Sequence, residues 1–404
     1  MTTARKHLVA SDQARFYHIT TRCVRRAFLC GDAFEHRKDW VYRRLRFLAD
    51  LFPVSVAGYA VMSNHLHLVV RYDPTATAEW SADTVYDRWF TLRGRLSAGA
   101  QSAEGATEAD CGAAMMSNVD DAAAQEHRQR HTSDADWVAR TREKLGSLGW
   151  FMRELKHFIA LRANQEDGCK GHFWEARYYS QPLLDQAALA ACMVYVDLNP
   201  IRAQMAETPE SSAFVSVQER IQARTRRTTH PQPGGRWRAG PEPSAKPKPL
   251  PKTPTTTPDD QSRPAFFPTP DGRIDTCVDE AHPNWLLPLR QCVISEWPVD
   301  TTAPTPAWIS RDRYLQLVDE TGRCIRAGKR GAIPQHLADI LHRLDLEPVQ
   351  WLAAMSRGGS LEGSALGAFA RRQSEAARRG LRWLANRCRL FSDSTARQVS
   401  AVDV

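Results

Sequence analysis

Apolar and polar residues follow two different periods along the first 72 positions, and these predict strands and one helix. Residues 15–23 (RFYHITTRC) are rich in β-branched and aromatic side chains and predict a first strand. Residues 38–52 predict a helix, because apolar residues recur there at helical spacing: Trp40, Val41, Leu45, Leu48 and Leu51. Strand-like runs follow at 54–62 and 65–72, and the Ser-Asn pair between them favours a tight hairpin.

The pattern changes after residue 73. Residues 83–96 have helical spacing, whereas the stretch at about 96–135 is rich in glycine, alanine and acidic residues and predicts a flexible surface insertion. Three further elements are predicted beyond it: one or two helices over 134–165, a strand over 171–184 and a helix over 185–206. Asp185 is the expected N-cap of that last helix, and Pro200 limits it.

Proline and basic residues dominate positions 222–272, where aliphatic residues are scarce. Such a segment cannot build a core and is expected to be a linker. It divides the chain into a first domain at 12–215 and a helix-rich accessory domain at 280–392.

Composition narrows the class of protein. The net charge of +8 and the pI of about 9.1 suit a polyanionic partner such as nucleic acid, without requiring one. The nine cysteines form no CxxC pair, which favours reduced thiols in the cytoplasm. The N-terminus has no signal-like apolar stretch, and no run approaches the roughly 18 apolar residues of a membrane helix, so we expect a soluble, cytoplasmic protein.

Two histidines stand one residue apart in the run GYAVMSNHLHLVVRY, residues 58–72. Side chains in a strand alternate between faces, so His65 and His67 share one face. The opposite face is apolar and is formed by Leu66, Leu68 and Val70. Two neutral imidazoles on one face are suited to a divalent metal. A pair of hydrogen-bonded structural histidines is an equally good interpretation of the motif alone.

A third ligand is available in MVYVDLNPIRA. Tyr195 and Asn199 are four residues apart and share one face of the predicted helix. The Asn199 amide oxygen would complete a His, His, Asn set and leave positions open for water and a phosphate oxygen. The alternative is that Tyr195 is a core aromatic and that Asn199 caps the helix before Pro200.

Four blocks in order, YAVMSNHLHLVV, LGWFMRELKHF, GHFWEARYY and YVDLNPIRA, make the chain resemble the REP-associated tyrosine transposases. These belong to the single-tyrosine HUH transposases of bacterial insertion sequences, in which HUH denotes His, hydrophobic residue, His. The resemblance spans roughly residues 12–215. It implies an α+β fold, the HUH endonuclease fold, with a ferredoxin-like antiparallel sheet, helices, and the HUH motif on a central strand.

The resemblance also implies the chemistry. His65, His67 and Asn199 match the metal-ligand positions for Mg2+ or Mn2+, and Tyr195 matches the nucleophile. A transposase of this type is a single-stranded DNA endonuclease and strand transferase that acts at hairpins of repeat palindromes. Its tyrosine forms a covalent 5'-phosphotyrosine link and releases a 3'-hydroxyl. Tyr178 and Tyr179 are competing tyrosines, but their strand-like aromatic setting favours core packing or base stacking.

The expected partner is single-stranded DNA with hairpins, bound by a monomer or a homodimer. Four residues in the matching blocks are candidate phosphate contacts: Lys156, His157, Arg162 and Arg177. Trp150, Phe173 and Trp174 are candidates for base stacking, but core packing is the favoured role for most of them. The arginine-rich segment 369–390 is expected either to grip a hairpin stem or to be a solvated helix face.

Two other functions fit parts of the pattern. A catalytically silent, hairpin-binding regulator on the same fold would retain the DNA contacts alone. A metal-dependent hydrolase of the amidohydrolase type also uses His-x-His at a strand, but it requires an eight-stranded barrel. The predicted insertion and linker leave too little ordered chain for eight such repeats.

Overall fold

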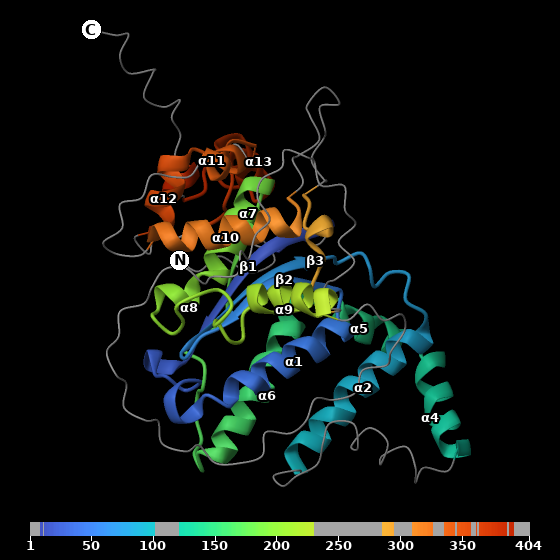
Figure 1. The fold of residues 1–404 in the computed structure, drawn as a ribbon. Helices are drawn as coiled ribbons and strands as arrows, with labels where there is room; N and C mark the ends of the chain where they lie inside the picture. The colour runs from blue at the N-terminus through green and yellow to red at the C-terminus, as the bar shows by residue number, and fades with distance from the viewer. Residues whose placement is uncertain are drawn as a thin grey trace.

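The computed structural model describes residues 9–10, 12–101, 121–229, 285–294, 309–325, 335–343, 346–356, 361, 363–385 and 388–391. A four-stranded antiparallel sheet lies at its centre (Figure 1). The strands are β1 (Arg15–Arg22), β2 (Val54–Val61), β3 (His65–Tyr72) and β4 (Tyr179–Leu183), in the spatial order β2-β3-β1-β4.

Two helices complete the connectivity of the sheet. Helix α1 (Arg37–Leu51) joins β1 to β2, and α6 (Leu148–Glu166) lies between β3 and β4. This βαββαβ order with strand order 2-3-1-4 is the ferredoxin-like arrangement. The expected α+β class and antiparallel sheet are therefore confirmed.

The first face of the sheet is covered by α1 and α6. Leu66, Leu68 and Val70 of β3 belong to this core, as the alternation in the sequence predicts. Helices α2 (Ala82–Gln101), α4 (Asp121–Ser133) and α5 (Ala135–Leu145) extend this layer (Figure 1). Ser147 caps α6 by accepting from the Trp150 amide at 3.3 Å, which helps to start the helix where it does.

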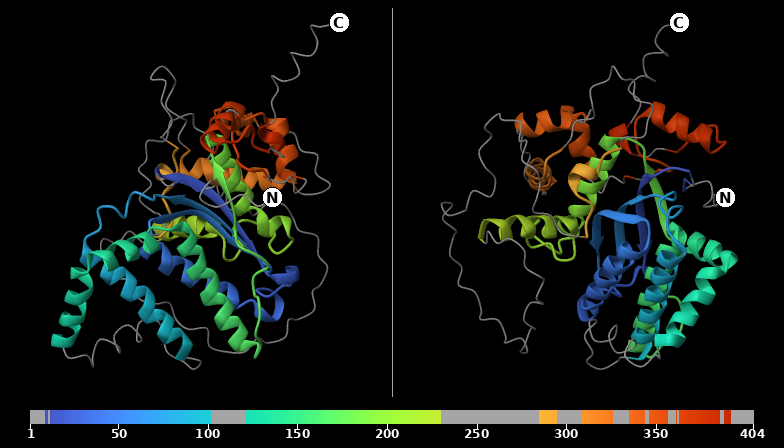
Figure 2. Two further views of the ribbon diagram at one scale, coloured as in Figure 1. Left: turned by 180° about the vertical axis from the view of Figure 1, so that it is seen from behind. Right: turned by 90° about the vertical axis from the view of Figure 1, so that its right-hand side faces the viewer.

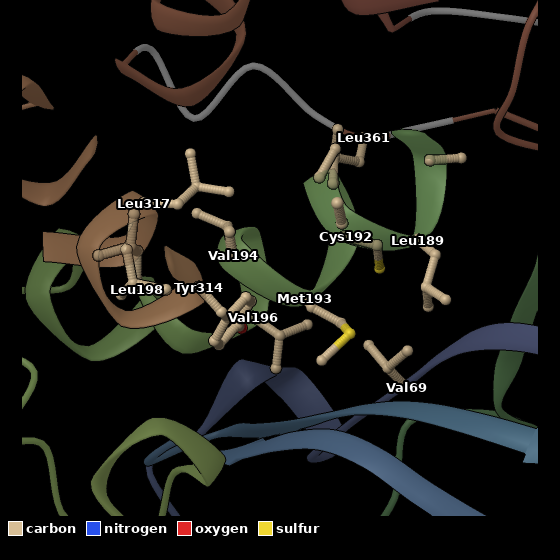
Figure 3. Packing of buried hydrophobic residues seen from close by; sticks show 14 of the residues in the cluster. Val69, Leu189, Cys192, Met193, Val194, Val196, Leu198, Tyr314, Leu317 and Leu361 are labelled. Carbon is tan, nitrogen blue, oxygen red and sulfur yellow. The ribbon is translucent and has the colours of Figure 1, made fainter. Parts of the chain in front are cut away.

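The second face of the sheet is covered by α7 (Gln186–Asp197), and helices from the C-terminal part of the chain pack on α7 (Figures 1 and 2). Asp185 is the N-cap, as expected, and accepts from the Ala188 amide at 2.8 Å. In Figure 3, Val69 of β3 lies beneath Met193 and Val196 of α7.

The remaining helices are α8 (Asn199–Arg202), α9 (Ser216–Thr229), α10 (Arg311–Ile325), α11 (Gln335–Arg343), α12 (Pro348–Ser356) and α13 (Phe369–Arg378). Short 3-10 turns occur at Val24–Arg26, Asp32–Phe34, Leu289–Gln291 and Arg389–Phe391. Side chains from α10 and α12 share one core cluster with α7 and with the second face of the sheet. The proposed division into two domains stays a prediction. None of the helices in the described part of the chain combines the length and apolar character of a membrane span.

A buried carboxylate anchors the C-terminal end of α7. Asp197 Oδ1 accepts from Ser216 Oγ at 2.5 Å and from the Val217 amide at 3.1 Å, and Oδ2 accepts from the Tyr314 hydroxyl. Burial raises the pKa of Asp197, and the nearby Arg220 cation opposes that rise. These bonds join α7 to α9 and α10, two residues beyond Tyr195.

Two predicted elements are shorter than the sequence suggests. The predicted strand over 171–184 is wrong for 171–178, which form a loop that bonds to the end of β1: the Val24 amide donates to the Phe173 carbonyl, and the Glu175 amide donates to the Arg22 carbonyl. The predicted helix over 185–206 stops at Asp197 and restarts as the single turn α8. Proline at the first turn of α8 explains the restart, since proline is tolerated there and not in a helix interior.

Two segments expected to lack structure are partly helical. The flexible-insertion prediction is wrong for 121–133, where α4 packs its histidines on the aromatic side chains of α2: His127 and Phe90 have ring centroids 5.0 Å apart. Residues 102–120 of that insertion lie outside the described residues. The linker prediction is wrong for 222–229, which continue α9, and the rest of the predicted linker also lies outside them.

Leu68→Ala tests the first core. Leu68 is fully buried between the sheet and its helices, so the substitution is expected to lower the free energy of unfolding by about 2–5 kcal/mol. Leu161→Ala is the control, because Leu161 is 54% exposed and is expected to change stability by less than about 0.5 kcal/mol. Urea unfolding measures both, and equal losses would contradict the assignment of this core.

Candidate active site

The α7-facing side of the sheet is divided into an apolar half and a polar half. The apolar half consists of Phe16, Val69 and Leu183 and packs under α7. In the polar half, the β1–β3 register pairs Thr20 with His67 and Arg22 with His65. The β1–β4 register pairs His18 with Gln181 and Thr20 with Tyr179. Directly paired residues of an antiparallel sheet point to the same face, so these side chains form one polar surface.

This polar surface is the floor of an open cleft with a volume of about 510 Å3. One wall is Tyr195 of α7, and another is the loop 175–177 before β4. The C-terminal part of the chain supplies a further wall through Leu361, Gly363, Ser364 and Ala385. A single tyrosine from α7 and one histidine of the His-x-His pair therefore face the same solvent-accessible space.

A chain of buried polar groups orients His67. His18 Nε2 lies 2.9 Å from His67 Nδ1, and the two rings are stacked with centroids 5.1 Å apart. On the other side, Gln181 Nε2 donates to the Gly363 carbonyl at 2.7 Å, which fixes the orientation of its amide. His18 Nδ1 and Gln181 Oε1 are both buried, and neither has a hydrogen-bond partner among the described residues.

The groups around the two histidines indicate which ring nitrogens carry the protons. The Gln181 side chain opposes part of the lowering of the His18 pKa, as an amide oxygen near a ring N–H does, and this favours the His18 tautomer with the proton on Nδ1. In that tautomer His18 Nε2 accepts from His67 Nδ1, and Thr20 Oγ1, 3.3 Å from His67 Nδ1, is the second polar group beside it. This arrangement leaves His67 Nε2 as a bare lone pair, which is the form that binds a metal ion.

His65 is oriented in a comparable way by its neighbour. Its Nδ1 lies 2.6 Å from Asn64 Oδ1, and the Asn64 amide nitrogen donates to the Arg26 carbonyl at 3.0 Å. His65 Nδ1 must therefore donate, which leaves its Nε2 free as well. The His65 and His67 rings lie with centroids 4.8 Å apart. The donor set fits a divalent cation, although the described residues contain no group of three or more histidine, cysteine or acidic side chains able to hold one.

Burial keeps this cluster neutral at physiological pH. It lowers the pKa of His18 to about 4 and that of His65 to about 4, the latter helped by the Arg22 cation. The pKa of His67 is lowered well below its ordinary value by burial and by the neighbouring histidines and arginines. Neutral imidazoles are the form required for metal ligands and for the hydrogen-bond chain.

Tyr195 lies beside the histidines. Its ring centroid is 5.7 Å from that of His67 and 6.1 Å from that of His18. On another side, the Arg202 guanidinium carbon lies 4.7 Å from the Tyr195 ring centroid. Burial raises the pKa of the Tyr195 phenol, and the Arg202 cation opposes part of that rise. The phenol is therefore protonated at neutral pH and needs a nearby positive charge or a base to react.

Asn199 is placed differently from the histidine pair. It is buried, and its Nδ2 donates to the Tyr195 carbonyl oxygen at 3.0 Å. That bond leaves Oδ1 as the atom available to a ligand. No hydrogen bond joins Asn199 to either imidazole in the described part of the chain, so its role as a third ligand stays a prediction.

The competing tyrosines have different environments. Tyr178 is buried in the first core. Tyr179 is 50% exposed, lines the same cleft as Tyr195, and donates its hydroxyl to the Gly363 carbonyl. Tyr179 is therefore the alternative nucleophile, and an experiment that assigns Tyr195 as the nucleophile must include it.

The four candidate phosphate contacts are dispersed. Arg177 lines the cleft, and Lys156 Nζ is 2.5 Å from the Ala176 carbonyl at its rim. His157 is exposed on α6, and Arg162 lies over the Trp40 ring at 4.2 Å in the layer of α1 and α6. The structure does not bring these last two to the cleft. Phe173 and Trp174 are buried in the first core and Trp150 packs against it, which confirms the core interpretation of all three.

The stem-gripping hypothesis for the arginine-rich segment is wrong for two of its arginines. Arg372 is buried and donates to the Gly367 and Phe391 carbonyls, and Arg379 is buried and donates to Glu375 at 2.6 Å. Glu375 also binds Arg15 of β1 at 2.6 Å. These guanidinium groups attach α13 to the rest of the chain and are not available to phosphates.

Sequence reasoning missed His18, Thr20, Gln181 and Arg202. His18 and Thr20 alternate within the predicted first strand, but only the strand order shows that they face His67. Arg202 lies seven residues after Tyr195, which is about two helical turns and would have been a usable signal.

Comparisons with known proteins give one structural neighbour. No protein-family model matches the chain, and no curated protein matches it. A solved structure of a REP-associated tyrosine transposase bound to a REP hairpin is similar, with 11% sequence identity and a TM-score of 0.31. The alignment covers 57% of this chain and 89% of that chain. Similarity at this level is too low to assign roles to individual residues.

Stability is expected to fall with acid because the histidine cluster is buried neutral. The pKa of His18 falls from 6.5 in the unfolded chain to about 4 in the folded one. The unfolded state therefore binds more protons in that window, and stability present above the unfolded pKa is lost as pH falls through it. His18 alone corresponds to a loss on the order of 3 kcal/mol.

Urea unfolding in EDTA, at about pH 7 and at about pH 4.5, measures this effect. His18→Gln is expected to reduce the acid-induced loss, and His172→Gln, at an exposed position, is expected to leave it unchanged. An identical loss in the parent and in His18→Gln would contradict the buried neutral cluster.

Proposed function

We propose that the chain is a transposase: a metal-dependent, single-stranded DNA endonuclease and strand transferase that acts at DNA hairpins. The observation that supports this most directly is that Tyr195 and the oriented imidazole of His67 line one cleft. The Tyr195 and His67 ring centroids are 5.7 Å apart, and His65 lies next to His67. A nucleophile beside a cation site is the arrangement that phosphodiester cleavage through a covalent intermediate requires.

Divalent metal would be held by His65 Nε2, His67 Nε2 and the Asn199 amide oxygen. When bound, Mg2+ or Mn2+ would neutralise charge on the scissile phosphate and polarise it for attack. Few anionic ligands suit this task, because the ion must also attract a phosphate. The contact between His67 Nδ1 and His18 Nε2 supports the His67 tautomer that this role needs.

The proposed reaction exchanges one phosphodiester bond for another. The Tyr195 oxygen attacks phosphorus, the bond from phosphorus to the 3'-oxygen breaks, and the 3'-oxygen leaves with a proton as a hydroxyl. The 5'-phosphate remains on Tyr195. Attack by the 3'-hydroxyl of another strand reverses the step and joins the two strands, so no nucleoside triphosphate is consumed.

The cleft suits a single strand. Arg22 and Arg177 line it, and cations at such positions bind the phosphates of a strand without reading its sequence. The net charge of +8 adds a general attraction for DNA. The choice of hairpins as the target comes from the sequence resemblance.

Covalent-adduct formation tests the proposed function. The parent protein, Mn2+ and a 3'-labelled single-stranded hairpin are expected to give a labelled protein band on a denaturing gel. Tyr195→Phe is expected to abolish that band. Tyr179→Phe is the matched control, since Tyr179 lines the same cleft, and it is expected to retain the band.

The other outcomes separate the alternatives. An adduct that survives Tyr195→Phe and disappears in Tyr179→Phe would show that Tyr179, the first residue of β4, is the nucleophile. Hairpin binding with no adduct, for Mg2+ and Mn2+ alike, would contradict the enzyme and favour the silent hairpin-binding regulator.

Metal binding is expected to depend on the two proposed histidine ligands and, to a lesser extent, on His18, which contacts one of them. His65→Ala and His67→Ala are expected to abolish Mn2+ binding measured by electron paramagnetic resonance. His18→Phe, which removes the nearer of the two polar groups at His67 Nδ1 and leaves Thr20 in place, is expected to weaken Mn2+ binding about 10–100-fold. Exposed His172→Ala is the control, and unchanged Mn2+ affinity in His65→Ala would contradict the ligand assignment.

A further inference from the structure

Arg202 lies against the ring of the proposed nucleophile, Tyr195, and the sequence analysis did not single it out. It lies in the last turn of α8, directly after α7, and its amide donates to the Leu198 carbonyl at 3.0 Å. Its guanidinium carbon is 4.7 Å from the centroid of the Tyr195 ring.

The Arg202 guanidinium has unused donor capacity. Its Nη1 is buried and has no hydrogen-bond partner among the described residues. No ion pair of Arg202 with an acidic side chain occurs in that part of the chain. Arg37 pairs with Glu166 and Asp167 and Arg379 pairs with Glu375, whereas Arg372 donates to backbone carbonyls. Arg202 as a whole is half-buried, but a buried donor atom without a partner is costly, which favours an acceptor from outside the chain at Nη1.

Position identifies the anion. The Arg202 charge acts on both Tyr195 and His67, so it lies within electrostatic reach of the nucleophile and of one proposed metal ligand. A phosphate under attack by Tyr195 would be an anion within reach of this guanidinium. The planar fork of a guanidinium matches two phosphate oxygens, whereas an ammonium presents a point charge.

We propose that Arg202 is a catalytic residue that binds a non-bridging oxygen of the phosphodiester attacked by Tyr195, and of the phosphotyrosine that results. This inference rests on the proposed function. Arg202 transfers no proton: the bond from Tyr195 to phosphorus forms, the bond to the 3'-oxygen breaks, and the guanidinium stabilises the charge on phosphate throughout.

The first arm of the test uses inorganic phosphate as the probe and requires no cleavage. In EDTA and at constant ionic strength, phosphate is expected to raise the Tm of the parent. The gain is expected to vanish in Arg202→Gln, to persist in part in Arg202→Lys, and to persist fully in Arg140→Gln, which changes an exposed arginine of α5. No gain in the parent, or the same gain in Arg202→Gln, would overturn the inference.

The second arm measures the rate of adduct formation on the DNA hairpin. Arg202→Gln is expected to lower the rate about 100-fold to 1,000-fold, as removal of one charge-stabilising donor does elsewhere. Arg202→Lys is expected to recover part of that loss. Urea unfolding of each variant shows whether it folds, and Arg202→Lys keeps the test valid should Arg202→Gln be unstable.

The two arms distinguish failure of this inference from failure of the proposed function. An unchanged rate in Arg202→Gln, with an adduct in the parent, would overturn the role of Arg202 and leave the transposase proposal intact. Absence of an adduct in the parent would overturn the proposed function, while the phosphate arm would still decide whether Arg202 is an anion-binding residue.

Discussion

The pairing register of β1 with β3 is the constraint on which the whole site depends. It sets Thr20 opposite His67 and Arg22 opposite His65, so that the polar residues of both strands share one face. Because side chains alternate along a strand, a slip by one residue would send every one of them into the core under α1 and α6. The apolar residues Leu66 and Leu68 resist such a slip, since it would expose them. The same alternation that builds the core therefore builds the floor of the cleft.

Tyr195 forms one wall of the cleft, and its position depends on how α7 is held. This helix covers only the apolar half of its sheet face, and its anchor, Asp197, bonds to α9 and α10. Tyr195 is two residues before that anchor, at the boundary where the apolar half gives way to the cleft. The C-terminal part of the chain thus has two effects at the site: it immobilises α7 through Tyr314, and it contributes Gly363, which orients Gln181.

Much of this arrangement follows from local sequence rules. Alternation identified the core face of β3, helical spacing identified α1, and Asp185 marked the start of α7. The partners of His67 could not be found that way, because His18 and Gln181 reach it only through strand pairings between residues far apart in the chain. Long-range packing also explains the errors. Aromatic residues at 173–174 resemble a strand but fill the core as a loop. Arg372 and Arg379 resemble part of a DNA-binding face but are bound to a backbone carbonyl and to Glu375, respectively.

The central claim is that the hydroxyl oxygen of Tyr195 forms the covalent bond to DNA. The most direct measurement is peptide mass spectrometry of the protein after incubation with a hairpin oligonucleotide and Mn2+, followed by nuclease and protease digestion. The account predicts a nucleotide 5'-phosphate attached to the peptide that contains Tyr195 and to no other tyrosine. Attachment at Tyr179, or unmodified tyrosines after demonstrated hairpin binding, would contradict it.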